Sequence, residues 1–263
     1  MRKILQRGGV VVLLLLGGCY TVPETGRQSM ILVPAGEESA MGATAFADIQ
    51  SKETVSTDPR YLERIRRVGR RIAEAVGSDL PSARWEFVVF DAPKTVNAFA
   101  LPGGKVGVYS GLLRVALTDD ELAIVMGHEI GHVTARHGAE RMTEGILLAA
   151  GGLVVDAATT NSRSADRTAW MLGYGLLAGG TALKFSRSHE SEADYIGIRY
   201  AAKAGYNPEA AITFWRKMEQ QSQGGQAPAF LSTHPPHEQR IADLQKWMPQ
   251  VLPLYEAAKG HYR

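Results

Sequence analysis

The sequence lacks several features that would point to particular classes of protein. Cys19 is its only cysteine, so the chain cannot form an intramolecular disulfide. Its 29 basic and 27 acidic residues nearly balance, which argues against a polyanionic partner such as nucleic acid. It has no internal repeat and no low-complexity tract. With 45% hydrophobic content over 263 residues, the chain can bury a core in one or two domains.

Long hydrophobic runs are also missing. A membrane-spanning helix needs roughly 20 apolar residues. The run Val10–Leu16 is far shorter, and the apolar stretches at 145–158 and 169–183 are interrupted by a polar stretch. We expect these two stretches to form buried helices or a helical hairpin, with a hairpin that touches the membrane surface as the alternative. A protein embedded in the membrane is therefore disfavoured.

The N-terminus has the layout of a signal peptide. Three basic residues precede the Val10–Leu16 run, and L-G-G-C follows it, which is typical of a bacterial lipobox. We expect Cys19 to carry a lipid; the alternative is a small residue in a hydrophobic segment. Tyr20 in the next position favours the outer membrane over the inner one. The expected organisation is a signal peptide at 1–18, a lipidated tether and strap at 19–50, and a folded domain at 51–263.

The remaining pattern predicts a mainly helical α+β domain with a small sheet. Asp58 and Pro59 begin an amphipathic helix that ends before Gly77, and its polar face carries five arginines, which we interpret as a solvated face. Thr118 and Glu121 form a capping-box pattern at the start of another helix. The other expected elements are a strand at 85–90, a hairpin of 96–101 with 105–109, helices at 187–204 and 208–221, and a last helix to about Trp247.

The helix that follows Thr118 contains the sequence H-E-I-G-H. Residues four apart on a helix point the same way, so His128 and His132 present two imidazoles to one point. Imidazole nitrogen is a favoured ligand of zinc. Glu129 is placed to act as general base toward an attacking water. The alternative for so short a motif is two ordinary histidines on a helix.

A catalytic zinc with two histidines needs a third protein ligand. Glu190 and Asp194 lie four apart on one predicted helical face, so Glu190 could bind the metal while Asp194 orients a ligand imidazole from behind. Glu192 points about 200° away from Glu190 around that helix. Position 138 is glycine rather than a third histidine, which favours a glutamate ligand.

Three linked motifs give the chain a family resemblance. The segments H128-E-I-G-H132, R187-S-H-E-S-E-A-D194 and H234-P-P-H-E-Q-R240, in this order, resemble the zinc metallopeptidases (gluzincins) that include CAAX prenyl protease, HtpX and the Oma-type proteases. The lipobox and the length are most similar to the periplasmic lipoprotein branch of that family, which includes LoiP. The resemblance implies a compact helical metalloprotease domain with one zinc ion and endopeptidase activity.

The resemblance also implies roles for individual residues. His128, His132 and Glu190 would bind zinc, with Glu129 as the catalytic base. His234 would lie close to the metal, as a removable plug, a group that acts in the transition state or a structural ligand. Arg240 would steady an oxyanion or a nearby carboxylate. The strand that contains Asn97, Ala98 and Phe99 would bind an extended peptide substrate by strand addition.

These expectations lead to two functional hypotheses. The first is a zinc-dependent endopeptidase of the bacterial cell envelope that cleaves misfolded or unassembled proteins, is anchored by lipid in the periplasm, and works alone or with assembly or protease partners. The second is a zinc-containing lipoprotein chaperone or scaffold for outer-membrane assembly, with His234 as a permanent fourth ligand. Because a structural zinc site has no use for a base, Glu129 favours the enzyme.

Overall fold

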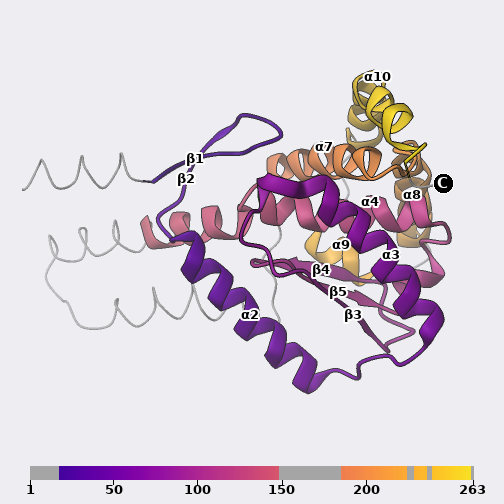
Figure 1. Ribbon diagram of the computed structural model, residues 1–263, viewed down its shortest axis with the longest axis horizontal. Coiled ribbons are helices and arrows are strands. Elements are labelled where there is room, and N and C mark those ends of the chain that lie inside the picture. The colour runs from indigo at the N-terminus through magenta and orange to yellow at the C-terminus, as the bar shows by residue number, and fades with distance from the viewer. Residues whose placement is uncertain (1–17, 148–184, 224–227, 236–238, 262–263) are drawn as a thin grey trace, which may run out of the picture. The chain divides into compact units, whose positions relative to one another are not determined.

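The computed structural model describes residues 18–147, 185–223, 228–235 and 239–261 (Figure 1). The expected signal peptide, except for Gly18, and nearly all of the two apolar stretches lie outside these residues. None of the helices in the described ranges is long and apolar enough to cross a membrane. The chain divides into two compact units, residues 1–38 with 136–182 and residues 39–135 with 183–263, and each is described by itself.

The first unit contains a short antiparallel pair of strands. Strand β1 (Cys19–Thr21) pairs with β2 (Gln28–Met30), and the exposed Cys19 opens β1. Residues 137–147 are helical, and Arg27 forms an ion pair at 2.8 Å with Glu140 in that segment. The segment expected to be an irregular strap therefore includes regular structure.

Helix α2 (Ala35–Lys52) begins in the first unit and continues in the second. The sequence analysis placed no helix here, and the domain boundary that it set at residue 50 falls inside α2. The helix is rich in small residues and has no strong apolar stripe, so helical periodicity gave little signal. Its buried anchor is Phe46, which packs edge-on against the rings of Phe90 and Phe99.

The second unit contains a three-stranded mixed sheet in the order β3-β5-β4. Strand β5 (Lys105–Tyr109) lies in the middle, parallel to β3 (Glu86–Phe90) and antiparallel to β4 (Ala98–Leu101). The predicted strand and hairpin are confirmed. Gly103 and Gly104, both at φ +83°, make the turn of the hairpin, a backbone conformation that favours glycine.

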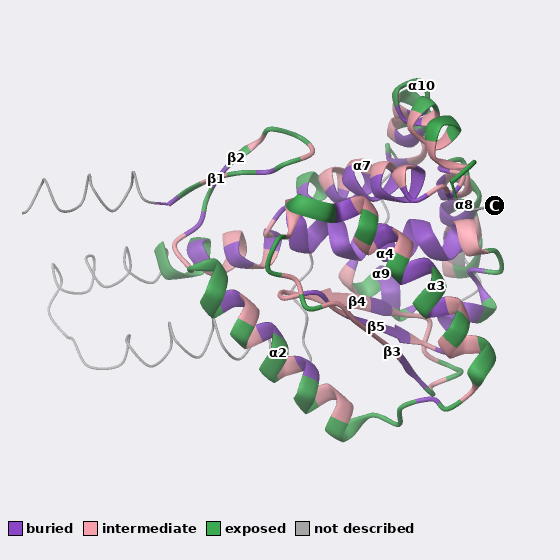
Figure 2. Cartoon of the chain, in the orientation of Figure 1, coloured by how far each residue is buried: buried purple, intermediate pink, exposed green. Residues whose placement is uncertain are grey.

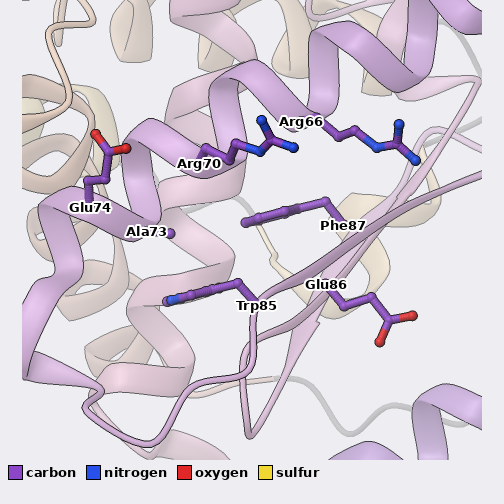
Figure 3. Close-up of a pocket in the computed structure, with 7 residues that line it drawn as sticks. All are labelled: Arg66, Arg70, Ala73, Glu74, Trp85, Glu86 and Phe87. Carbon is purple, nitrogen blue, oxygen red and sulfur yellow. The ribbon is translucent and has the colours of Figure 1, made fainter.

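Helix α3 (Pro59–Val76) packs against β3, and its predicted start and end are confirmed. The Asp58 side chain accepts a hydrogen bond from the Arg60 backbone N–H at the first turn. At Gly69 a Cβ would lie 2.5 Å from the ring of Phe87, so glycine brings the helix close to the strand. Figure 3 shows Phe87 and Trp85 stacked beside α3, on the side where Arg66 and Arg70 extend.

The helical layer of the second unit is centred on α4 (Asp119–Thr134), which packs against α7 (Arg187–Lys203). The predicted capping box of Thr118 and Glu121 is present at the start of α4. From Glu121 onward every residue of α4 is buried, as Figure 2 shows in purple. The other helices are α8 (Ala210–Gln223), α9 (Ala229–Thr233) and α10 (Arg240–Ala258), with short 3-10 turns at Gly77–Asp79 and Leu112–Arg114.

The last helix is longer than the sequence analysis predicted. Helix α10 continues past Trp247 through Pro249 and Pro253 to Ala258. Proline removes one backbone donor and usually breaks or bends a helix interior. Leu244, Met248 and Val251 are buried on one face of α10, and its packing against α7 overrides that local preference.

Candidate metal centre

Two glycines bring the motif helix and its neighbour into close contact. A Cβ on Gly127 of α4 would lie 2.6 Å from the carbonyl oxygen of Gly197 on α7, and a Cβ on Gly197 would lie 2.6 Å from the backbone nitrogen of His128. One turn further along α4, a Cβ on Gly131 would lie 3.0 Å from the carbonyl oxygen of Ala193 on α7. Because only hydrogen fits at Gly127 and Gly197, the two backbones approach closely beside the histidines.

This crossing brings together the three residues that the sequence predicts as ligands. The Nε2 atoms of His128 and His132 lie 3.2 Å apart. Glu190 reaches them from α7, with carboxylate oxygens 3.6 Å from the His128 Nε2 and 3.5 Å from the His132 Nε2. All three side chains are buried. Glu190, rather than Glu192, is the α7 glutamate in this cluster.

His234 joins the cluster from the end of α9. Its Nδ1 lies 3.2 Å from the His128 Nε2 and 2.9 Å from a Glu190 oxygen, and its Nε2 lies 3.2 Å from Glu129. One ligand atom from each of His128, His132, Glu190 and His234 lies within 4.8 Å of the others. The structure thus places His234 near the predicted ligands. Residues 236–238 of its motif lie outside the described residues.

The geometry of the cluster fits a tetrahedral zinc ion. Nitrogen and oxygen ligands bound at about 2.0–2.2 Å with tetrahedral angles lie about 3.3–3.6 Å from one another. The separations of 3.2, 3.5 and 3.6 Å among His128, His132 and Glu190 are close to that range. Among the described residues Glu190 Oε2 is buried and makes no hydrogen bond, although a buried carboxylate oxygen normally has one and the Arg240 Nη2 lies 3.3 Å from it. A cation among these atoms would satisfy it.

Asp194 fixes the orientation of His128. The His128 Nδ1–H donates to Asp194 Oδ1 at 2.9 Å, because an ionised carboxylate can only accept. This bond leaves the lone pair of Nε2 directed at the cluster, which is how a ligand histidine is usually held. Burial alone raises the pKa of Asp194, but the Arg240 guanidinium and the His128 bond outweigh it and hold that pKa below its usual range.

Arg240 contacts carboxylates at the rear of the cluster. Its Nε lies 2.6 Å and its Nη2 2.8 Å from the two oxygens of Asp194, and Nη2 lies 3.3 Å from Glu190. Of the two roles that the sequence analysis left open for Arg240, these contacts favour steadying a carboxylate. Burial raises the pKa of Glu190, but hydrogen bonds with His132 and His234 outweigh it and lower that pKa strongly.

Glu129 is buried beside the cluster on the side of strand β4. Burial raises its pKa, and the neighbouring His234 and His128 offset only part of that effect. The backbone of Ala100 in β4 also hydrogen-bonds to this carboxylate. Glu129 Oε1 makes no hydrogen bond within the described part of the chain, and the His234 Nε2 lies 3.2 Å from it. A buried carboxyl group with a raised pKa is suited to accept a proton near neutral pH.

Aromatic rings enclose the histidines. The Phe185 ring stacks on His132 at a centroid distance of 3.9 Å, and the Phe230 ring stacks on His234 at 4.6 Å. Trp215 of α8 lies edge-on to His128 at 6.0 Å. The sequence analysis assigned none of these three residues to the site, because a single aromatic residue in a helix or loop carries no spacing signal of its own.

The predicted substrate strand lies at one edge of the described sheet. The Asn97 carbonyl accepts from the Tyr109 N–H, and the antiparallel pairing continues between β4 and β5. Hydrogen bonds alternate in such a ladder, so the backbone groups of Ala98 and Ala100 face away from β5, toward Glu129. The Phe99 side chain packs with Phe46 and Phe90 instead. Asn97 Oδ1 is buried and has no hydrogen-bond partner in the described ranges.

Comparison with known proteins places this site in a family context. The sequence model of Peptidase family M48 matches residues 35–248. The mitochondrial metalloendopeptidase OMA1 of Schizosaccharomyces pombe is 36% identical over 232 residues, which cover 88% of this chain and 66% of the relative. The enzyme of the same name from Saccharomyces cerevisiae is 33% identical over 277 residues, covering 95% of this chain and 78% of the relative.

Bacterial relatives match over a similar part of the chain. The beta-barrel assembly-enhancing protease of Escherichia coli strain K12 is 30% identical over 244 residues. The alignment covers 89% of this chain and 48% of that protein. The chain thus spans about half the length of this relative and just under two thirds of the Schizosaccharomyces pombe relative.

Proposed function

Because the chain belongs to Peptidase family M48 and is a zinc metalloendopeptidase, we propose that it cleaves misfolded or unassembled proteins of the bacterial cell envelope. The observation that carries this proposal is the buried cluster of His128, His132 and Glu190 with a buried carboxylate, Glu129, beside it. In this proposal those three residues hold one zinc ion. Bound zinc supplies Lewis-acid chemistry, which polarises the scissile carbonyl and acidifies water.

The side chains around the metal then have distinct tasks. Glu129 accepts the proton of the attacking water, a task that its raised pKa suits. His234, 3.2 Å from Glu129, can donate a hydrogen bond to the developing oxyanion once a substrate displaces it from the cluster. Arg240 neutralises Asp194 and keeps His128 oriented.

The edge of β4 is the proposed binding site for the substrate backbone. An extended peptide that pairs with Ala98 and Ala100 would run alongside Glu129, since the Ala100 backbone already contacts that carboxylate. Asn97, the residue before β4, would lie where the substrate peptide reaches this edge. Because Phe99 points into the aromatic core, recognition here would come from backbone hydrogen bonds, which suits an enzyme that acts on many unfolded sequences.

Location in the envelope rests on the lipobox. We propose that Cys19 carries a lipid that tethers the mature chain in the periplasm, at the outer membrane. The Cys19→Ser variant should lose labelling with a radioactive fatty acid and move from the membrane fraction to the soluble periplasmic fraction. Equal labelling of both proteins would refute the anchor, and it would leave the peptidase proposal intact.

The proposed reaction is tested with Glu129→Gln. We expect this variant to keep zinc but to cleave casein about 10²–10⁴ times more slowly than the wild type, because it lacks the base. A matched control is Glu74→Gln, an exposed glutamate on α3, which should cleave at the wild-type rate. Equal cleavage by wild type and Glu129→Gln, or cleavage that persists after zinc is removed with a chelator, would refute the mechanism.

The natural substrates require a separate experiment. Glu129→Gln expressed in the native cell should retain uncleaved client proteins, which can be recovered with it from envelope fractions and identified by mass spectrometry. The proposal expects unassembled envelope proteins among them. Recovery of the same proteins with a variant that lacks the β4 edge contact, such as Ala100→Pro, would argue against binding by strand addition.

A chaperone or scaffold is the second candidate, and the position of His234 favours it. As a fourth ligand, His234 would close the metal site, and closed sites are typical of structural zinc. The His234→Ala variant separates the two. Altered casein cleavage with zinc retained would indicate a displaceable group, with slower cleavage if His234 serves the oxyanion and faster cleavage if it only blocks the site. Loss of both zinc and folding would indicate a structural ligand.

A further inference from the structure

Arg240 is an unusual cation because its whole side chain is buried, with an exposed fraction of 2%. Its guanidinium faces Asp194 through Nε and Nη2, at 2.6 and 2.8 Å. The third nitrogen, Nη1, is buried without a hydrogen-bond partner among the described residues. Asp194 and Glu190 balance its charge, but a buried donor without a hydrogen bond still costs free energy unless another group stabilises it.

The face of Trp215 supplies that compensation. The guanidinium carbon of Arg240 lies 3.2 Å from the centroid of the Trp215 ring. The negative face of an indole attracts a cation more strongly than any other aromatic side chain, and the attraction is greatest where water is excluded. Trp215 has an exposed fraction of 2%, so this contact is fully desolvated.

The indole N–H of Trp215 gives a second reason to assign its role to the ring face. This N–H is buried and has no hydrogen-bond partner among the described residues. Buried tryptophans usually find a partner for it, and an unmet donor destabilises the fold. A leucine or phenylalanine at 215 would avoid that cost. The N–H group therefore does not explain a tryptophan at this position, whereas the ring face contacts Arg240.

A continuous set of contacts links this ring to the metal cluster. Trp215 holds Arg240, Arg240 donates to Asp194 Oδ1 at 2.8 Å, and the same oxygen accepts the His128 Nδ1–H at 2.9 Å. We propose that Trp215 is a positioning residue of the metal centre: by fixing Arg240 it fixes Asp194, and so the direction in which His128 presents Nε2. This proposal rests on the proposed role of His128 as a ligand.

The proposal gives helices α8 and α10 a part in metal binding. Neither helix carries a residue of the cluster, yet Trp215 lies on α8 and Arg240 is the first residue of α10. Packing between these two helices thereby determines how firmly a residue of α4 is held. Changes in α8 should be measurable as changes in zinc affinity.

The test compares zinc affinity between three variants by competition with a fluorescent chelator. Trp215→Leu, which keeps apolar bulk but has no ring, should raise the zinc dissociation constant about 10-fold, as is typical for groups that orient a metal ligand. Trp215→Phe should lie between Leu and wild type. The matched control is Trp247→Leu on α10, whose ring contacts Tyr195, and it should leave zinc affinity unchanged.

A second version of the test avoids any change of shape. Tryptophans that carry one, two or three fluorines, incorporated at position 215, weaken the negative ring face step by step while the side chain keeps its form. The proposal expects the zinc dissociation constant to rise with each fluorine. A flat series, or equal affinities of Trp215→Leu and Trp247→Leu, would overturn it and leave Trp215 as a packing residue.

The outcomes also separate this proposal from the proposed function. Zinc affinity is measured without any substrate, so a wild type that binds zinc but cleaves nothing would refute the envelope peptidase and leave the Trp215 test valid. A wild type that binds no zinc would refute the metal centre, and this proposal with it. Thermal unfolding of the zinc-free variants reports lost packing separately from lost metal affinity.

Discussion

The metal centre and the surface hollow between α3 and β3 both combine arginine with tryptophan, but they differ in how charge is balanced. In the hollow, Arg66 and Arg70 are exposed beside the stacked rings of Trp85 and Phe87 (Figure 3). Water solvates those guanidinium groups, so their neighbours matter little. At the metal centre Arg240 is buried, and its charge depends on Asp194, Glu190 and Trp215. Replacing an arginine in the hollow should therefore affect its neighbours little, whereas replacing Arg240 should affect the groups that balance its charge.

Replacing arginines in both regions should show the largest difference. Arg240→Gln leaves Asp194 buried without its cation, and breaking a buried pair in this way typically costs about 3–5 kcal/mol of unfolding free energy. Arg66→Gln should change that free energy by no more than about 0.5 kcal/mol, as is usual for surface substitutions. Denaturant unfolding of the zinc-free proteins measures both values. Similar losses for the two variants would remove the distinction between the regions.

Replacing glycines that allow close packing should show a smaller difference in stability between the two regions. An alanine at Gly127 would meet the backbone of Gly197, which cannot move aside, so Gly127→Ala should destabilise the fold by about 1–3 kcal/mol and weaken zinc binding. At Gly69 the added methyl would meet the ring of Phe87, which can shift.

Gly69→Ala also gains about 1 kcal/mol of helix propensity, so its net effect should be close to zero. Thermal unfolding of the two variants, together with their zinc content, measures the difference. A Gly127→Ala variant with wild-type stability and full zinc content would show that the close approach of α4 and α7 does not determine the geometry of the metal centre.

The elements nearest the site were the most predictable from sequence. The start of α4 follows from Thr118 and Glu121, because a capping box satisfies backbone donors locally. The placement of His128 and His132 on one side of α4 follows from helical geometry alone. Spacing also separated Glu190 from Glu192, since only one of them shares a face with Asp194.

Features that depend on long-range packing could not be read from local patterns. Helix α2 is held by Phe46 against the sheet, and its own sequence shows little amphipathic signal. Helix α10 continues through Pro249 and Pro253 because its apolar face is buried. The approach of His234 was expected only from the family resemblance, and the contact of Trp215 with Arg240 was not expected. Both join segments far apart in the chain, so no spacing rule predicts them. The small residues at 127 and 131, four apart on α4, were an available signal for the helix crossing.

The most direct measurement of the central claim is the zinc content of purified protein after dialysis against a weak chelator. The account predicts one zinc per chain for wild type, and loss of that zinc in His128→Ala and Glu190→Gln. Glu192→Gln, on the same helix but outside the cluster, should retain one zinc. Zinc that remains bound to Glu190→Gln at wild-type affinity, or is lost equally from Glu192→Gln, would contradict the account.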